Sequence, residues 1–263
     1  MLRPLCPLFL SGLGMRIIFL VLILSIASCG PKPPAEIRFL EHFNQGEDMF
    51  ARGEYQDALA NYRRALKIND KYSPLYRRIA LTLEHLDMLD SAIVYYEGAI
   101  VFDPKDIDSY QRVGDIYFLR NMLNEAMSWY ERALDLGYLR PQSYVKLGTI
   151  YNAWREYDQA GVYFKYATVL DSTNAEAFYG LGLVELARDD TSSAIVSFDK
   201  AVELGPVAKA TYMLGLVCFK QDKVEEALKW FDVYLQLEPD GELASEAENY
   251  RKTIVLRQGT QGK

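Results

Sequence analysis

The chain repeats itself with a period of 34 residues over most of its length, and no other feature limits its fold as strongly. A column of small residues recurs at this interval, with one interval of 33: Gly46, Ala80, Gly114, Gly148, Gly182 and Gly215. An alanine column keeps the same spacing: Ala58, Ala92, Ala126, Ala160, Ala194 and Ala227. So does an aromatic column: Tyr62, Tyr96, Tyr130, Phe164, Phe198 and Phe231. Such a period indicates a fold in which each repeat is one small unit that packs on its neighbours.

The pattern inside each unit is helical. In residues 56–68 the apolar residues, among them Leu59, Tyr62 and Leu66, recur every three or four positions, whereas a half-buried strand would alternate them. Small residues are needed wherever two helix backbones approach closely. Short breaks at residues 51–55 and 119–123 separate the paired helices, and further breaks separate the units. We therefore predict an all-α fold of stacked helical hairpins.

The period and its columns resemble the tetratricopeptide repeat, a helix-turn-helix unit. Counted from Phe39, Ser73, Ile107, Pro141, Ala175 and Ala208, the family's large residue at position 4 appears as Tyr76, Tyr110, Tyr144 and Phe178. Units one and six depart from the family there, with His42 and Thr211. The resemblance covers residues 39–240 and implies six repeats, at 39–72, 73–106, 107–140, 141–174, 175–207 and 208–240. Stacked together, they would form one α-solenoid.

Residues beyond the sixth unit lose the repeat but keep one apolar helical face, made of Leu243, Ala244, Ala247, Tyr250 and Ile254. A terminal repeat needs a cover with a polar outer side if the stack is to end in water. We expect a capping helix over residues 241–258 and a frayed tail over residues 259–263.

The N-terminal segment is typical of an export signal. Residues 15–30 contain a basic residue, Arg16, then an apolar run at residues 17–24, then small residues leading to Cys29. Residues 26–29, Ile-Ala-Ser-Cys, resemble the lipobox of bacterial lipoproteins, in which the cysteine receives a diacylglycerol and becomes the N-terminus after cleavage. The resemblance implies a signal peptide at 1–28 and a lipid on Cys29. Residues 29–38 would form a tether stiffened by its prolines.

An uncleaved anchor helix is the alternative, because the apolar stretch can be extended back to Leu5. Arg16 interrupts that stretch, and Pro4 and Pro7 disfavour so long a helix, so cleavage is the favoured interpretation. Translation from Met1 and from Met15 gives the same mature protein. Two acyl chains suffice for stable membrane attachment. Residue 30 is not the aspartate that resembles an inner-membrane retention signal, so we expect the periplasmic face of an outer membrane, or an extracytoplasmic position in a Gram-positive host.

Charge and composition exclude several classes of function. The net charge is −7 and becomes −9 once residues 1–28 are removed, because Arg3 and Arg16 are the only charged residues lost. Nucleic-acid binding needs a basic face, and no basic cluster occurs in the sequence. The two histidines, His42 and His85, have no companion at metal-ligand spacing, and Cys218 alone would remain as a free thiol. We expect a protein that is not an enzyme, with no catalytic residue, no metal and no cofactor.

The family resemblance also implies a working surface. In tetratricopeptide solenoids the first helix of each unit lines the concave face, and positions 2, 5, 9, 12 and 13 point into a protein-binding groove. The candidates taken here, at positions 5, 9 and 12, are Phe43, Glu47, Phe50, Arg77, Leu81, Glu84, Gln111, Asp115, Phe118, Val145, Thr149, Asn152, Tyr179, Leu183, Leu186, Tyr212, Leu216 and Phe219. Their many apolar side chains favour an apolar peptide as the ligand. The alternatives are that they pack between helices, that the cap fills the C-terminal end of the groove, or that the convex face binds.

Three functions fit these features. The first is a lipid-anchored scaffold of the bacterial cell envelope that holds partner proteins in the groove and assists assembly of a pilus, a secretin, or an outer-membrane or wall-remodelling machine. The second is a chaperone or carrier for exported chains, and the third is a self-assembling structural lipoprotein. The sequence leaves the partner and the oligomeric state open.

Overall fold

The computed structural model describes residues 33–137, 139–205 and 207–261. The expected signal peptide, Cys29 and the first part of the tether lie outside these residues, as do the last two residues of the chain. So does the apolar stretch considered above as an uncleaved anchor.

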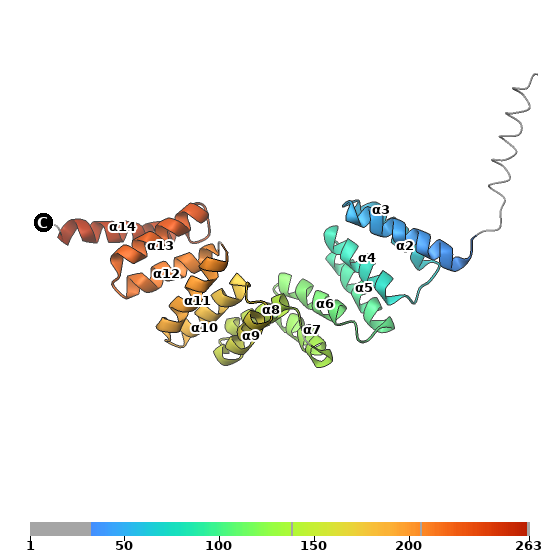
Figure 1. The fold of residues 1–263 in the computed structure, drawn as a ribbon, viewed down its shortest axis with the longest axis horizontal. Coiled ribbons are helices and arrows are strands. Elements are labelled where there is room, and N and C mark those ends of the chain that lie inside the picture. The colour runs from blue at the N-terminus through green and yellow to red at the C-terminus, as the bar shows by residue number, and fades with distance from the viewer. Residues whose placement is uncertain (1–32, 138, 206, 262–263) are drawn as a thin grey trace, which may run out of the picture.

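Thirteen helices and no strand occur in the described residues, and twelve of the helices pair into six hairpins (Figure 1). The first helices are α2 (Ala35–Ala51), α4 (Ser73–His85), α6 (Ile107–Leu119), α8 (Pro141–Ala153), α10 (Ala175–Ala187) and α12 (Ala208–Lys220). The second helices are α3 (Tyr55–Leu66), α5 (Leu89–Phe102), α7 (Leu123–Leu136), α9 (Tyr157–Leu170), α11 (Thr191–Leu204) and α13 (Val224–Leu237). The last helix is α14 (Ala244–Gln261). The predicted all-α solenoid of six hairpins and a final helix is confirmed.

Two helix boundaries differ from the expected ones. α2 begins at Ala35, four residues before the first repeat was expected to start, and α14 continues to Gln261, past residue 258. The repeat period fixes which residues are equivalent between units, but it does not determine where the terminal helices begin and end. At α2 the chain leaves Pro34 directly into a helix whose first turn carries Glu36, an acid that favours the positive end of the helix dipole.

The repeat columns meet in the core of each hairpin. A methyl group added to Gly46 would lie 2.5 Å from the Tyr62 ring, and one added to Gly182 would lie 2.5 Å from the Phe198 ring. The small residue of the first helix therefore makes room for the aromatic ring of the second. The alanines of the second column are fully buried in all six units, as Ala58 and Ala227 illustrate. This contact explains why the small and aromatic columns repeat in step.

Every hairpin turns at the same position of the unit. The turn residues are Gly53, Asp87, Asn121, Arg155, Asp189 and Asp222, and all have a positive φ between 57° and 77°. In each turn the following N–H donates to a carbonyl five residues back, as Met88 does to Leu83 at 2.9 Å. This hydrogen bond closes the end of the first helix in the Schellman pattern, for which a left-handed residue is required.

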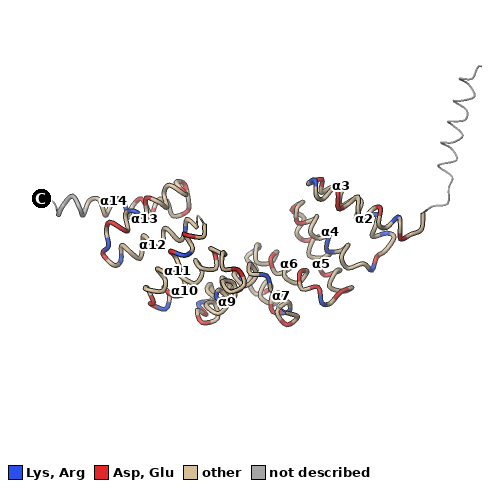
Figure 2. Tube along the Cα trace, in the orientation of Figure 1, with Lys and Arg blue, Asp and Glu red and all other residues tan. Residues whose placement is uncertain are grey.

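The hairpins stack into a curved solenoid that is hollow on one side (Figure 1). α8 contacts the first helices of both neighbouring repeats, α6 and α10, and α6 and α8 lie nearer the hollow than α7 and α9 (Figure 1). Lys and Arg are spread along the chain among Asp and Glu rather than gathered on one face (Figure 2). None of the helices in the described ranges is both long and apolar enough to cross a membrane.

The final helix covers the sixth hairpin. Ala247 and Ile254 of α14 are fully buried. The Tyr250 ring lies parallel to Phe231 with ring centres 5.2 Å apart, and it meets Phe219 edge-on at 5.0 Å. The apolar face expected for a capping helix is therefore the face that packs on the stack.

Candidate functional site

The concave side of the first four repeats is held together by a recurring group of three side chains, which we call the acid joint. Each acid joint contains a tyrosine from the second helix of a repeat, an acid from its first helix, and a base from the first helix of the next repeat. In the first joint Tyr62 donates a hydrogen bond to Glu47, and Glu47 forms an ion pair with Arg78. The acid therefore bonds to its own hairpin and to the next one.

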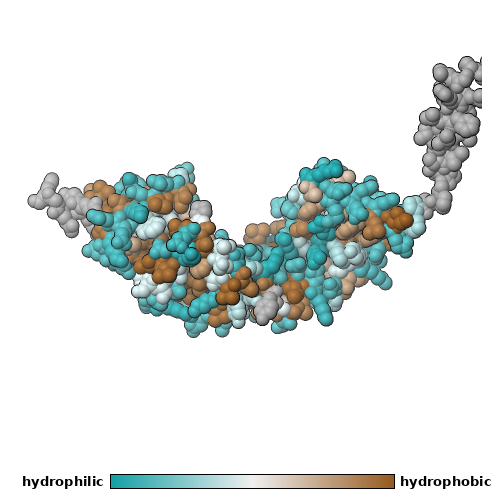
Figure 3. Space-filling view, viewed as in Figure 1, coloured by the Kyte–Doolittle hydropathy of each residue, from teal (hydrophilic) through white to brown (hydrophobic). Residues whose placement is uncertain are grey.

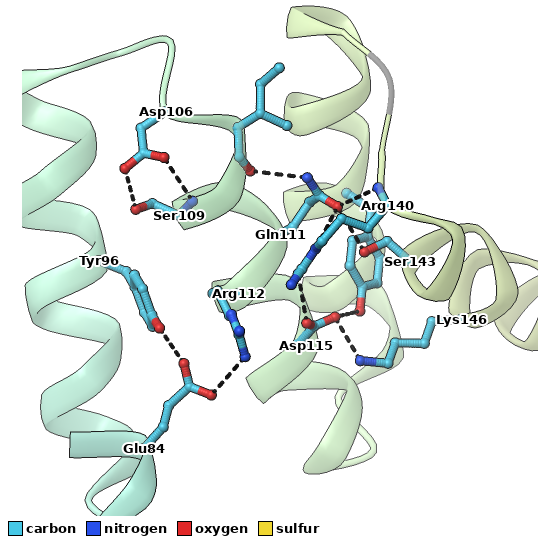
Figure 4. A network of polar contacts seen from close by, with 12 residues as sticks. Glu84, Tyr96, Asp106, Ser109, Gln111, Arg112, Asp115, Arg140, Ser143 and Lys146 are labelled. Atoms are coloured by element: carbon cyan, nitrogen blue, oxygen red, sulfur yellow. Dashed lines mark hydrogen bonds and ion pairs between the residues drawn. The ribbon is translucent and has the colours of Figure 1, made fainter. Parts of the chain in front are cut away.

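The second and third acid joints lie side by side in the middle of the solenoid (Figure 4). Tyr96 donates to Glu84, whose other oxygen lies 3.5 Å from Arg112 Nη1. Tyr130 donates to Asp115 Oδ1 at 2.8 Å, and the same carboxylate pairs with Lys146 at 2.7 Å and with Arg140 at 3.0 Å. The second joint links repeats two and three. The third links repeats three and four.

These tyrosines act as fixed hydrogen-bond donors. Burial, together with the neighbouring acids, raises the pKa of Tyr62, Tyr96 and Tyr130 above the usual tyrosine range. The rings of all three are fully buried. Each hydroxyl therefore stays protonated and keeps donating to its carboxylate at neutral pH.

Other polar groove positions are also occupied by contacts between repeats. Arg77 Nη1 lies 2.9 Å from Oδ1 of Asp106, the residue that caps the start of α6 in the next repeat. The side-chain oxygen of Gln111 accepts from the backbone N–H of Arg140 at 2.8 Å and from Ser143 Oγ at 3.0 Å (Figure 4). The polar groove residues of the first three repeats thus take part in repeat-to-repeat contacts.

The acid joint ends at the fourth repeat. The tyrosine column changes to phenylalanine at Phe164, Phe198 and Phe231. Two of the joint acids, Glu47 and Asp115, stand at position 9 of the unit, and Glu84 stands at position 12. Repeats four to six have no acid at either position, with Thr149, Leu183 and Leu216 at position 9. The base column becomes Gly180 and Met213 in repeats five and six. A side chain at Gly180 would overlap the Phe164 ring, so no base can stand there while that ring keeps its place.

The predicted groove residues therefore fall into different environments. Gln111, Val145 and Tyr212 are buried, Thr149 is exposed, and the other fourteen are half-buried. Several half-buried aromatic residues are in contact with other rings: Phe43 with Tyr62 and Tyr72, Phe50 with Tyr55 and His85, and Phe219 with Tyr250 of the cap.

A set of apolar positions remains on the first helices of the last two repeats. Tyr179, Leu183 and Leu186 lie along α10, and Leu216 lies on α12. All four are half-buried at the edge of the core clusters. The structure places them in succession on the first helices of these repeats, so we define these four residues as the apolar concave row.

The sequence-based reasoning missed a second apolar surface. On the second helix α9, Val162, Tyr166, Val169 and Leu170 recur at helical spacing, and their exposures run from 47% for Val162 to 81% for Val169. These four residues stand at positions of the unit that face outward. None of those positions belongs to the repeated columns of small, alanine or aromatic residues by which the repeat is identified. The signal was therefore present only as an apolar residue at every third or fourth position of one helix.

His85 and Cys218 take packing positions. The His85 ring lies parallel to Tyr55 at 4.4 Å and meets Phe50 edge-on at 5.2 Å. Burial raises the pKa of the Cys218 thiol, and its side chain is buried in the last core cluster. No group of three or more metal-ligating side chains occurs where the structure describes the chain.

Comparison with known proteins agrees with this architecture. Residues 39–72, 107–136 and 179–242 match family models described as tetratricopeptide repeats. The chain has the fold of a tetratricopeptide repeat solenoid. No curated protein matches it.

Solved tetratricopeptide repeat structures resemble the solenoid over most of its length. YrrB, described as a TPR protein with an unusual peptide-binding site, is 25% identical, with a TM-score of 0.61 and coverage of 72% of this chain and 97% of YrrB. PilF of Pseudomonas aeruginosa is 16% identical, with a TM-score of 0.69 and coverage of 82% of this chain and 98% of PilF. MamA is 20% identical, with a TM-score of 0.57 and coverage of 64% and 91%. The likenesses to PilF and MamA establish the fold alone.

Proposed function

We propose that this tetratricopeptide repeat protein is a non-enzymatic scaffold of the bacterial cell envelope that binds an apolar segment of a partner protein on the apolar concave row. The lipid on Cys29 would hold it at the periplasmic face of the outer membrane, where it assists assembly of an envelope complex. The observation that carries the proposal is the change from acid joints to Tyr179, Leu183, Leu186 and Leu216 along the first helices.

The acid joints support this choice of site. In the first three repeats the polar groove residues bond to neighbouring repeats, so a ligand would have to compete with those contacts. In repeats five and six the corresponding side chains are apolar and half-buried, and a ligand that covers them gains by removing apolar surface from water. YrrB, whose description mentions a peptide-binding site, lends support to a peptide ligand.

The location rests on residues 15–30. Their basic residue, apolar run and Ile-Ala-Ser-Cys ending resemble a lipoprotein signal, and a diacyl anchor supplies the two chains that stable attachment needs. A scaffold at a membrane surface matches the fold, because a solenoid offers an extended surface along its whole length.

Affinity purification of the lipidated protein from detergent-solubilised envelopes tests the proposal. Wild type is compared with a variant of the apolar concave row, Tyr179→Ser with Leu186→Ser, and with a matched variant of the outward surface, Val162→Ser with Val169→Ser. Circular dichroism and thermal unfolding first establish that both variants fold.

We expect a few envelope proteins in stoichiometric amounts with wild type and with the outward variant, and their loss with the concave variant. Partners that survive the concave changes and vanish with the outward ones would move the binding site to α9. A long list of weakly bound exported chains would favour the chaperone function instead.

A further inference from the structure

The start of α2 presents apolar side chains to solvent. Ile37 is 48% exposed and Leu40 is 53% exposed, and the two are three residues apart on the first turns of the helix. Apolar surface gathers over this end of α2 in Figure 3. Side chains of this size in water are unfavourable unless something else covers them.

A cleft adjoins Leu40, and a partly exposed tyrosine packs on the neighbouring Phe39. Phe39, Leu40 and Ile68 line a cavity of about 360 Å³ between the start of α2 and the end of the first hairpin. The Tyr72 ring meets Phe39 edge-on at 5.3 Å and is 38% exposed. Tyrosine is enriched where a protein meets the headgroup layer of a membrane, because its ring is apolar and its hydroxyl is polar.

The apolar character is confined to one end of the exposed face of α2. Further along the helix the exposed residues are polar: Glu41, Asn44, Gln45 and Asp48. A surface for a partner that lay along the whole helix would not change in this way. The change instead suits a boundary between an apolar and an aqueous medium that crosses the helix near Leu40.

The length of the chain before α2 places this end close to a membrane. Cys29 is six residues before Ala35, and six residues span at most about 20 Å. A lipid on Cys29 would therefore keep the first turn of α2 within about 20 Å of the anchor. This step rests on the lipid attachment included in the proposed function.

We propose that the first turns of α2 enter the headgroup layer of the membrane that holds the Cys29 lipid, with Ile37 and Leu40 as the inserted side chains and Tyr72 at the boundary. The first turns of α2 carry no basic excess that would favour anionic lipids, because Glu36 and Glu41 are exposed beside Arg38. Contact with the apolar part of a zwitterionic bilayer drives the insertion. The solenoid then stands with repeat one at the membrane and α14 at the far end (Figure 1).

Depth-dependent quenching tests the insertion. The lipidated, full mature chain carries Cys218→Ala, so that one added cysteine can be labelled with an environment-sensitive dye, and it is placed in phosphatidylcholine vesicles containing a quencher-bearing lipid. The label is put at Glu41→Cys or at the matched position Asp48→Cys, which lies on the same face about 10 Å further along the helix. Both substitutions leave Ile37 and Leu40 in place.

We expect quenching at position 41 to be several times that at position 48, and to fall to the lower value when Ile37→Ser and Leu40→Ser are added. Apolar faces of interfacial helices reach about 5–10 Å into the boundary layer, so the two positions differ in depth. Equal quenching at both positions, in a protein whose Cys29 lipid is verified by mass spectrometry, overturns the insertion and leaves the anchoring intact.

Two other results also overturn it. Absence of lipid on Cys29 removes the proposed anchoring and the insertion together. If the dye at position 41 is shielded from water in the absence of vesicles, and the shielding grows with protein concentration, a second copy of the chain covers Ile37 and Leu40.

Discussion

The first and second halves of the solenoid have the same helix packing, but their repeats are joined by different chemistry. Between repeats one and four, the carboxylate of each acid joint accepts a hydrogen bond from a tyrosine of its own repeat and forms an ion pair with a base on the first helix of the next repeat. From repeat four onward, phenylalanine replaces the tyrosine, and Thr149, Leu183 and Leu216 stand where Asp115 stands in repeat three. A residue on the concave side can therefore either bond to a neighbouring repeat or contact a ligand. In the first half of the solenoid, the acid joints use these residues for contacts between repeats.

The largest effect is expected where the two halves are alike. Gly114→Val and Gly182→Val each place a branched side chain against the buried ring of Tyr130 or Phe198. Overpacking of this kind costs about 1 to 3 kcal/mol, and we expect similar losses in urea unfolding for both variants. A large loss in one half only would mean that the halves differ in packing as well as in polar contacts.

The next largest loss of stability is expected in the first half and not in the second. Asp115→Ala leaves Tyr130, Lys146 and Arg140 without their shared carboxylate, and we expect it to lower the free energy of unfolding by about 2 kcal/mol. Thr149→Ala changes the equivalent, exposed position of repeat four and should cost about 0.5 kcal/mol or less. Urea unfolding of the two variants measures the contrast. Equal losses would mean that the acid joint adds nothing to stability.

Alkaline pH should weaken the acid joints of the first half, and burial also raises the pKa of Tyr179 and Tyr212 in the second half. Tyrosines of the unfolded chain ionise near pH 10, whereas burial and the acids raise the pKa of Tyr96 and Tyr130 in the folded protein. Their contribution is therefore fully present below about pH 10 and declines as the pH rises above it. At pH 11 we expect a loss of about 1 kcal/mol for each tyrosine.

The control for this pH effect is the variant Tyr96→Phe with Tyr130→Phe. Its free energy of unfolding should change less between pH 8 and pH 11 than that of wild type. An equal change in both proteins would assign the alkaline loss to other groups.

The smallest effect concerns the turns, which both halves share. Arg155 holds the left-handed turn position with φ of 62°, where a side chain with a Cβ is strained and glycine is not. We expect Arg155→Gly to stabilise the protein by about 0.5 to 1 kcal/mol, measured as a rise in the unfolding midpoint. Gly53→Arg, at the same position of repeat one, should have the opposite sign and a similar size.

The fold could be predicted from the sequence because its cause is local and repeated. Gly46 and Tyr62, or Gly182 and Phe198, meet inside one hairpin, so every unit displays the same pair at the same spacing. The terminal helices were predicted less well, because Ala35 and Gln261 lie outside the repeat and no neighbouring unit fixes where their helices end.

The groove was harder to predict, because its chemistry depends on residues from different repeats. Positions 5, 9 and 12 identify candidates, but nothing in a single unit shows that Asp115 is bonded to Lys146, 31 residues later. A signal did exist: the aromatic column changes from Tyr130 to Phe164 in the same repeat in which position 9 changes from Asp115 to Thr149. The acid joint can therefore be found in the sequence only by comparing how two of these repeated positions change from one repeat to the next.

The capping helix limits how such a protein can change in length. α14 lies against α13 as α12 lies against α11, so it occupies the place that the first helix of a seventh repeat would need. Tyr250 is already committed to Phe231 and Phe219. A repeat added after the cap would find its packing surface already covered. A longer relative would therefore gain a repeat by duplication inside the stack, between two repeats that are joined by the same kind of contact.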